Sequence, residues 1–252
     1  MKLSLCIESV FPELDFYDRI KYAANIGYDA IEMWDPSDRD INLIGQIASM
    51  NSIPIICCCL KNQWEIRVNS DIDMVLKNLY DTIDFVSDMD CRTFILMCGD
   101  IESARTDTQK NILIENLKKM AEIAEKKDVN LLLEPLNSLI DHKGYYLDSA
   151  CLGFEIIKCV NSDKVKLLYD CYHMQIMEGN LIKNITANLK YVGHIHCAGV
   201  PGRNEPFLGE INYQNIVKRL QQEGYNNYFG MEYWPTYNHE QSLKDNLAYF
   251  KL

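Results

Sequence analysis

The chain has 252 residues, of which 48% are hydrophobic and 24% are charged, as is usual for one soluble globular domain. The formal net charge of −11 argues against a protein that captures nucleic acid, because the phosphate backbone is normally met by a basic surface. It still allows a small anionic substrate that a local Arg or Lys holds.

Residues 1–10 carry one Lys and a short apolar stretch that Glu8 interrupts, so they predict neither a signal peptide nor a membrane span. We therefore expect a cytoplasmic protein. Ten cysteines are present, but Cys57, Cys58 and Cys59 are consecutive within an apolar run, and no Cys-x-x-Cys occurs. This pattern predicts buried, reduced thiols rather than disulfides.

Short apolar runs recur along the chain at a spacing typical of strands that are covered on both faces. They predict strands at 3–7, 30–33, 53–59, 93–97, 129–133, 165–169, 191–195 and 228–231. Between them, stretches of helical period include 16–26, 74–89, 112–124 and 213–223. Gly27 and Gly224 follow two of these stretches as helix-ending glycines.

This alternation predicts a (β/α)₈ TIM barrel that forms a single domain over 1–252. No Gly-x-Gly-x-x-Gly follows the first strand, which removes the usual argument for a dinucleotide-binding sheet. Polar connections at 135–146 and 197–211 should form the rim of the barrel mouth, and the segment 62–69 is a third candidate.

The last four predicted strands are each followed directly by a residue of a type that commonly binds metals. These residues are Glu134, Asp170, His196 and Glu232. They are separated by about one β-α unit each, so the carboxyl ends of parallel strands should bring them to one mouth. Three carboxylates crowded in a low-dielectric site repel one another unless a cation lies between them. The sequence therefore predicts a divalent metal site.

Three oxygen donors and one imidazole suit Mn²⁺ or Mg²⁺, with Co²⁺ and Zn²⁺ as further options. Such a metal keeps open positions for a hydroxy-carbonyl substrate, whose carbonyl it would polarise and whose enediolate it would stabilise. Glu134 and Glu232, on opposite sides of the ring of ligands, could give and take the carbon-bound proton.

Two further residues are candidates for substrate contact. His173 shares a loop with Asp170, where it could hydrogen-bond a substrate oxygen or merely cap a helix. Arg203 follows His196 and has a fork of donors suited to a carboxylate, although a surface ion pair with Glu205 is the plainer alternative.

Three more polar residues are weaker candidates for the functional site. Glu8 and Glu32 end the first two predicted strands, and we interpret them as groups that support the site from behind or anchor loops. His194 should face the same side as His196, but deeper, and a core histidine explains it equally well.

Several runs of this sequence resemble the hydroxypyruvate isomerase group of the xylose-isomerase-like barrels. They are HIHCAGVPGRNEP from His194, GEINY from Gly209, YDCYHMQ from Tyr169, EGN from Glu178, and MEY from Met231 with Pro235. The similarity runs from the first strand to the last helix.

Position by position, the resemblance implies metal ligation by Glu134, Asp170, His196 and Glu232, with Glu134 and Glu232 as the acid-base pair. It implies substrate contacts from His173 and Arg203, and a reaction of the hydroxypyruvate to tartronate-semialdehyde kind. One departure matters, because hydroxypyruvate isomerases commonly have Gln where this chain has His196, whereas the related ketose 3-epimerases have His.

The expected partner is thus a small hydroxy-carbonyl or sugar molecule, with neither nucleic acid nor membrane, and by analogy the chain could form a homo-oligomer. A ketose 3-epimerase is the close alternative to the isomerase. A metal-dependent lyase or dehydratase, a non-catalytic sugar-binding barrel and a DNA-repair endonuclease are further alternatives. The endonuclease would need several metals, more His ligands and a basic face, whereas this chain has five His at a net charge of −11.

Overall fold

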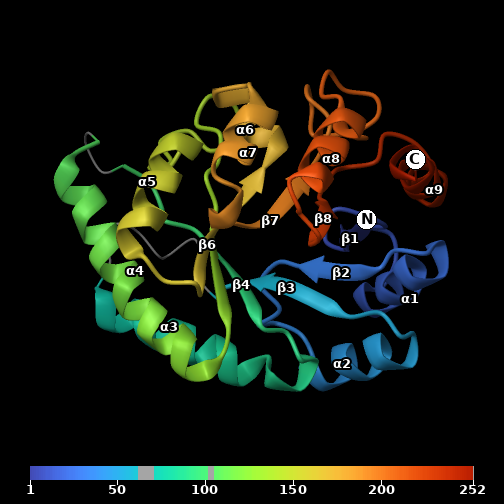
Figure 1. Cartoon of the computed structure of the whole chain (residues 1–252). Coiled ribbons are helices and arrows are strands. Elements are labelled where there is room, and N and C mark those ends of the chain that lie inside the picture. The colour runs from blue at the N-terminus through green and yellow to red at the C-terminus, as the bar shows by residue number, and fades with distance from the viewer. Residues whose placement is uncertain (62–70, 102–104, 252) are drawn as a thin grey trace.

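The computed structural model describes residues 1–61, 71–101 and 105–251, and its parallel strands close into one barrel surrounded by helices (Figure 1). In chain order the strands are β1 (Lys2–Cys6), β2 (Ala30–Met33), β3 (Ile55–Cys59), β4 (Thr93–Leu96), β5 (Asn130–Leu133), β6 (Val165–Asp170), β7 (Val192–Cys197) and β8 (Tyr228–Met231). Each strand pairs with the next, and β8 pairs with β1. The predicted (β/α)₈ barrel is confirmed.

The predicted strand positions are confirmed to within one or two residues, and two of the differences affect the candidate site. The apolar runs suggested that β6 and β7 stop just before Asp170 and His196. In the structure Asp170 is the last residue of β6 and pairs in register with His196, which lies inside β7. Both polar side chains therefore stand on the rigid sheet rather than on loops.

Helices cover the outside of the barrel and connect successive strands. They are α1 (Phe16–Ile26), α2 (Ile41–Met50), α3 (Ile72–Phe85), α4 (Asp107–Lys127), α5 (Ala150–Val160), α6 (Cys171–Met177), α7 (Leu181–Ala187), α8 (Tyr213–Gln222) and α9 (His239–Phe250). The predicted helix at 16–26 is confirmed to the residue. It ends at Gly27, whose φ of 104° is a left-handed conformation that glycine adopts without strain.

Two predicted helices have other limits. The stretch 74–89 is interrupted after Phe85, and residues Ser87–Met89 form a 3₁₀ turn. The helix predicted at 112–124 is longer at both ends. It starts at Asp107, where Thr106 and Gln109 form a capping box, and it ends at Lys127, before Asp128 in a left-handed conformation.

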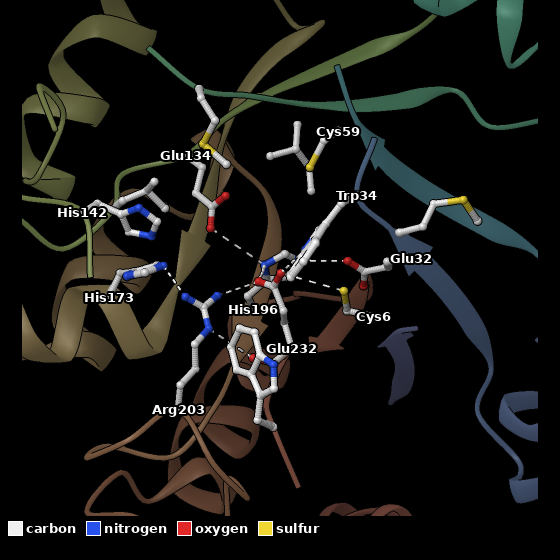
Figure 2. A pocket seen from close by; sticks show the side chains of 15 residues that line it. Cys6, Glu32, Trp34, Cys59, Glu134, His142, His173, His196, Arg203 and Glu232 are labelled. Atoms are coloured by element: carbon white, nitrogen blue, oxygen red, sulfur yellow. Dashed lines mark hydrogen bonds and ion pairs between the residues drawn. The ribbon is translucent and has the colours of Figure 1, made fainter. Parts of the chain in front are cut away.

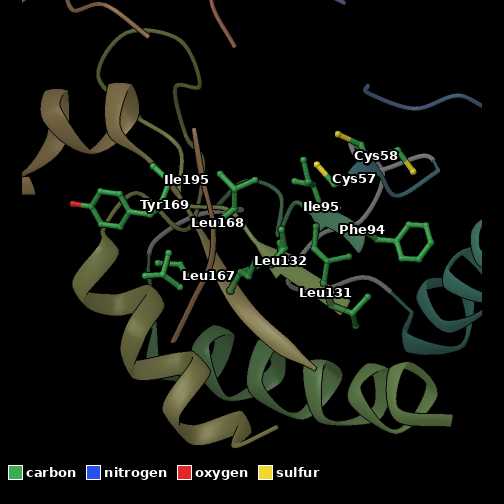
Figure 3. Close-up of a cluster of buried hydrophobic side chains, with 14 of the residues drawn as sticks. Cys57, Cys58, Phe94, Ile95, Leu131, Leu132, Leu167, Leu168, Tyr169 and Ile195 are labelled. Atoms are coloured by element: carbon green, nitrogen blue, oxygen red, sulfur yellow. The ribbon is translucent and has the colours of Figure 1, made fainter. Parts of the chain in front are cut away.

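The core lies between the barrel and the helices, as the cluster around β4, β5 and β6 shows (Figure 3). On β6, Tyr169 faces outward and its ring stacks on Phe154 of α5, with centroids 6.3 Å apart. Leu167 faces the same way and packs against Gly153 of α5. The neighbouring position, Asp170, faces the barrel interior, so one strand supplies both the core and the site.

All ten cysteines are free thiols, as predicted. Cys151 and Cys159 on α5 are exposed and the other eight are buried, including the consecutive three in β3. Within the described ranges no helix is both long and apolar enough to cross a membrane. The rim loop suggested at 62–69 lies outside the described residues.

Candidate metal centre

The structure brings the four predicted metal-ligand residues together at the carboxyl ends of β5 to β8. Glu134 directly follows β5, Asp170 ends β6, His196 lies in β7 and Glu232 directly follows β8. All four side chains are buried, and each offers one ligand atom within 4.8 Å of the others. This is the convergence that the strand-end positions predicted.

Two buried atoms of this cluster, His196 Nδ1 and Glu134 Oε1, have no hydrogen-bond partner among the described residues. His196 Nδ1 lies 3.9 Å from that oxygen and 3.1 Å from Glu232 Oε2. Buried polar atoms are rarely left unpaired, because losing water without a replacement partner is costly. A divalent cation among these atoms would satisfy them, so the donor set fits a metal of the kind predicted.

In two of the carboxylates, donors hold one oxygen so that the other faces the centre of the cluster. Asp170 Oδ1 accepts hydrogen bonds from the backbone N–H groups of Tyr172 and His173, which leaves Oδ2 facing inward. Glu232 Oε1 accepts from the indole N–H of Trp34 at 2.6 Å, which leaves Oε2 facing inward. The first turn of α6 and one aromatic side chain thus preorganise two ligands.

Arg203 reaches the same cluster from the loop after β7. Its Nη2 donates to Asp170 Oδ2 at 2.8 Å and to Glu232 Oε2 at 2.6 Å. The guanidinium lies between the rings of Tyr172 and Trp234, with distances to the centroids of 5.0 Å and 5.6 Å. Arg203 is thus held at the mouth, where it lines the cavity over the cluster (Figure 2).

The alternative surface pairing of Arg203 with Glu205 is wrong. Glu205 is buried, and it accepts hydrogen bonds from the backbone N–H and hydroxyl of Thr236 and from the hydroxyl of Ser242. This buried carboxylate anchors the loop to the start of α9. The anchored backbone then directs Arg203 inward.

His173 is fully buried beside Arg203, and its Nε2 lies 2.6 Å from Arg203 Nη1. The backbone N–H of Asn137 donates to its Nδ1 at 3.2 Å. Burial, with the nearby Arg203 charge, holds the pKa of His173 well below its usual range, so the ring is neutral. The structure therefore places His173 and Arg203 together in the cavity wall.

The two weaker acidic candidates have different surroundings. Glu8 pairs with Arg39, with Oε1 2.6 Å from Nη1, and anchors the loop after β1. Glu32 is buried behind His196, where His194 Nε2 lies 2.9 Å from Oε1 and His196 Nε2 lies 2.8 Å from Oε2. Burial alone would raise the pKa of Glu32, but the two histidines outweigh it and lower the pKa well below its usual range.

The two carboxylates predicted to move a proton have opposite electrostatic surroundings. Burial raises the pKa of Glu134 to about 8, and the negative charges of Glu232 and Asp170 add to this effect. Burial also opposes ionisation of Glu232, but the charges of Arg203 and His196 dominate and lower its pKa to about 2. Paired groups whose pKa values are pushed apart are typical of an acid and a base.

A cavity of about 210 Å³ opens over this cluster. Of the predicted site residues, all but Asp170 line it, and the lining also includes Trp34, Met97, Leu136, His142 and Trp234. The two tryptophans and His142 were not predicted as site residues. Trp34 directly follows β2 and Trp234 lies two residues after Glu232, so the same strand-end rule could have found them.

Gly230 of β8 makes room for the network behind the cluster. It pairs in register with His196, and a Cβ at this position would lie 2.5 Å from Glu32 Oε1 and 2.7 Å from His194 Nε2. We expect Gly230→Ala to lower the free energy of unfolding by about 1–3 kcal/mol through overpacking. Urea unfolding measures this, and an unchanged free energy would contradict the tight packing described.

Comparison with known proteins agrees with the fold. Residues 20–252 match the family model described as a xylose isomerase-like TIM barrel. The hydroxypyruvate isomerase of Escherichia coli strain K12 is 28% identical over 261 residues, which cover 97% of each chain. The 2-oxo-tetronate isomerase of Cupriavidus necator is 38% identical over 140 residues, which cover 56% of this chain and 52% of that one. A crystal structure of a protein named AP endonuclease, family 2, from Brucella melitensis has a TM-score of 0.92 and 26% identity, with 98% of both chains covered.

Proposed function

Because this chain belongs to the xylose isomerase-like TIM barrel family, we propose that it is a metal-dependent isomerase that interconverts small hydroxy-aldehyde and hydroxy-ketone compounds. The substrates would be 2-oxo acids of the hydroxypyruvate kind. One observation carries the proposal, namely the convergence of Glu134, Asp170, His196 and Glu232, all buried, in one metal-ligand cluster beneath a small cavity. The relatives named hydroxypyruvate isomerase and 2-oxo-tetronate isomerase support this substrate class.

In the proposed reaction, one carboxylate removes a proton from the hydroxymethyl carbon of hydroxypyruvate. The resulting enediolate receives a proton on the former carbonyl carbon, and the proton of the original hydroxyl passes to the former carbonyl oxygen, which gives tartronate semialdehyde. Glu134 and Glu232 move these protons. When bound by Glu134, Asp170, His196 and Glu232, a divalent cation such as Mn²⁺ or Mg²⁺ polarises the carbonyl and offsets the enediolate charge.

His173 and Arg203 would orient the substrate. Arg203 supplies a fixed positive charge beside the cluster, and its fork of donors matches a carboxylate or a carbonyl oxygen. His173, neutral and buried next to it, would contact a hydroxyl or carbonyl oxygen. The cavity of about 210 Å³ is small, which favours a short substrate.

A ketose 3-epimerase is the second candidate, favoured by the imidazole of His196, which the resemblance described in the sequence analysis associates with that activity. Both reactions remove a proton next to a carbonyl, so the same two carboxylates serve either. Measuring kcat/KM for hydroxypyruvate, 2-oxo-tetronate and a panel of neutral ketoses tests the proposal. Turnover of the 2-oxo acids alone supports the isomerase, and turnover of ketoses alone would replace it by the epimerase.

An endonuclease activity, which the name of the Brucella protein gives to that protein, has less support in this chain. The net charge of −11 opposes binding to a phosphate backbone. In the described part of the chain, the two metal-ligand groups found share His196, and they contain only one further histidine, His194.

We expect Arg203→Ala to lower kcat/KM for hydroxypyruvate by about 10- to 100-fold, the loss that follows removal of a hydrogen bond to a charged group. Neutral ketoses should lose much less. Arg39→Ala is the matched control, because Arg39 pairs with Glu8 and is absent from the cavity lining. Equal losses for anionic and neutral substrates would mean that Arg203 only maintains the structure.

A further inference from the structure

Glu32 is the acceptor at the centre of a buried network behind the candidate ligands. Oε1 accepts from the hydroxyl of Ser4 and faces His194 Nε2 at 2.9 Å, whereas Oε2 faces His196 Nε2 at 2.8 Å and the thiol of Cys57 at 3.2 Å. Four strands contribute to it, since Ser4 lies in β1, Glu32 in β2, Cys57 in β3 and the histidines in β7. Figure 2 shows the link between Glu32 and the His196 ring.

Both nitrogens of His196 face carboxylates, but Glu32 lies outside the group of candidate ligands, whereas Glu134 and Glu232 belong to it. Nε2 faces Glu32, whereas Nδ1 faces Glu134 and Glu232 and has no hydrogen-bond partner. A metal binds imidazole through a lone pair, so the His196 ring is neutral in the metal-bound state and carries one proton and one lone pair. The neighbour of one nitrogen therefore decides whether the other can act as a ligand.

An ionised carboxylate only accepts hydrogen bonds, so Glu32 requires a proton on His196 Nε2. That proton leaves the lone pair on Nδ1, directed at the other candidate ligands. His194 donates to the second oxygen of Glu32 and so fixes the plane of the carboxylate. Gly230 provides the space in which Glu32 and the two rings meet.

We infer that Glu32 is a positioning residue for the metal centre, which keeps the proton of His196 on Nε2 so that Nδ1 is the ligand atom. The inference rests on the metal site of the proposed function and adds a residue to it. Carboxylate partners of metal-binding histidines typically raise metal affinity by about 10- to 100-fold.

The first test is Glu32→Gln, with Mn²⁺ affinity measured by calorimetry in the absence of substrate. A carboxamide of the same shape accepts through its oxygen but donates through its nitrogen, so one histidine must present a bare Nε2. We expect Mn²⁺ affinity to fall by about 10- to 100-fold. Glu8→Gln is the control, because Glu8 lies outside this network and its loss should leave the affinity unchanged.

A double-mutant comparison separates this role from a general structural one. In His196→Gln the ligand atom is an amide oxygen, which has no tautomer to be fixed. Glu32→Gln should then change Mn²⁺ affinity by no more than about 2-fold. The same large loss in both backgrounds would overturn the inference, because Glu32 would be acting through something other than His196.

A direct measurement needs no variant. ¹⁵N NMR of histidine-labelled wild-type protein with bound Mg²⁺ should show His196 with its proton on Nε2 and the metal at Nδ1, and the reverse arrangement would overturn the inference. Failure of the wild type to bind any divalent metal would overturn the proposed metal site as well. Normal metal binding that Glu32→Gln leaves unchanged would overturn only the role of Glu32.

Discussion

Glu134→Gln is expected to lower turnover of the metal-loaded protein by about 10²- to 10⁴-fold, the usual contribution of a general acid or base. The amide keeps the shape of the side chain and an oxygen that can bind a metal, but it cannot exchange a proton. The same loss is expected for Glu232→Gln, because Glu232 is the other member of the pair. Turnover on hydroxypyruvate, corrected for bound metal, is the measurement.

Two controls make this prediction decisive. Circular dichroism and metal content show whether each variant is folded and loaded, so that a lost ligand is not mistaken for a lost proton carrier. Glu8→Gln removes a carboxylate that pairs with Arg39 away from the cluster, and it should retain normal turnover. Near-normal activity in either Glu134→Gln or Glu232→Gln would refute the acid-base assignment.

Removal of the metal by a chelator is expected to reduce turnover to background, and added Mn²⁺ or Mg²⁺ should restore it. The reason is that three buried carboxylates and one imidazole form the proposed site, and the carbonyl is not polarised without the cation. The protein without metal should also be less stable than the metal-loaded protein, since a ligand at 100 times its Kd contributes about 2.7 kcal/mol to the free energy of unfolding.

Turnover assays and thermal unfolding, with metal content measured in the same samples, check both effects. Full activity in protein shown to be free of divalent metal would contradict the proposed mechanism. Restored stability without restored turnover would show that the site binds metal for structural reasons alone.

The sequence was sufficient to predict the fold and to bring four metal-ligand candidates to one place. The reason is physical, because parallel strands in a barrel all end at the same mouth, so a polar residue at a strand end is placed by topology alone. Glu134, Asp170, His196 and Glu232 satisfy this rule, and their atoms meet in the structure. The metal itself and the proton-transfer roles remain proposals.

The strand-end rule alone does not separate Glu32 from the candidate ligands, although we interpreted Glu32 as a group that supports the site from behind, and the structure places it there. Glu32 also stands near a strand end, yet its side chain lies behind His196, and the pairing of β2 with β3 shifts register between Ile31 and Glu32. How far a strand residue lies below the barrel mouth depends on the register in which its strand pairs with its neighbours. Short apolar runs in the sequence do not reveal this register. The structure was needed to show that Glu32 contacts a candidate ligand.

Loop conformation was the other part that the sequence left open. Arg203 had an equally plain surface partner in Glu205 until the structure showed Glu205 buried against Thr236 and Ser242. Trp34 and Trp234 have no titratable chemistry, so a search for ligands and bases passed over them. They form part of the cavity wall because they follow strand ends, which is a matter of packing rather than reactivity.

The central claim is that this barrel moves a carbon-bound proton of a small 2-oxo acid. The most direct measurement is NMR of hydroxypyruvate incubated in D₂O with the protein and Mn²⁺. We expect conversion to tartronate semialdehyde, with deuterium at the carbon that receives the proton. Absence of both conversion and deuterium incorporation, in protein with metal confirmed bound, would contradict the claim.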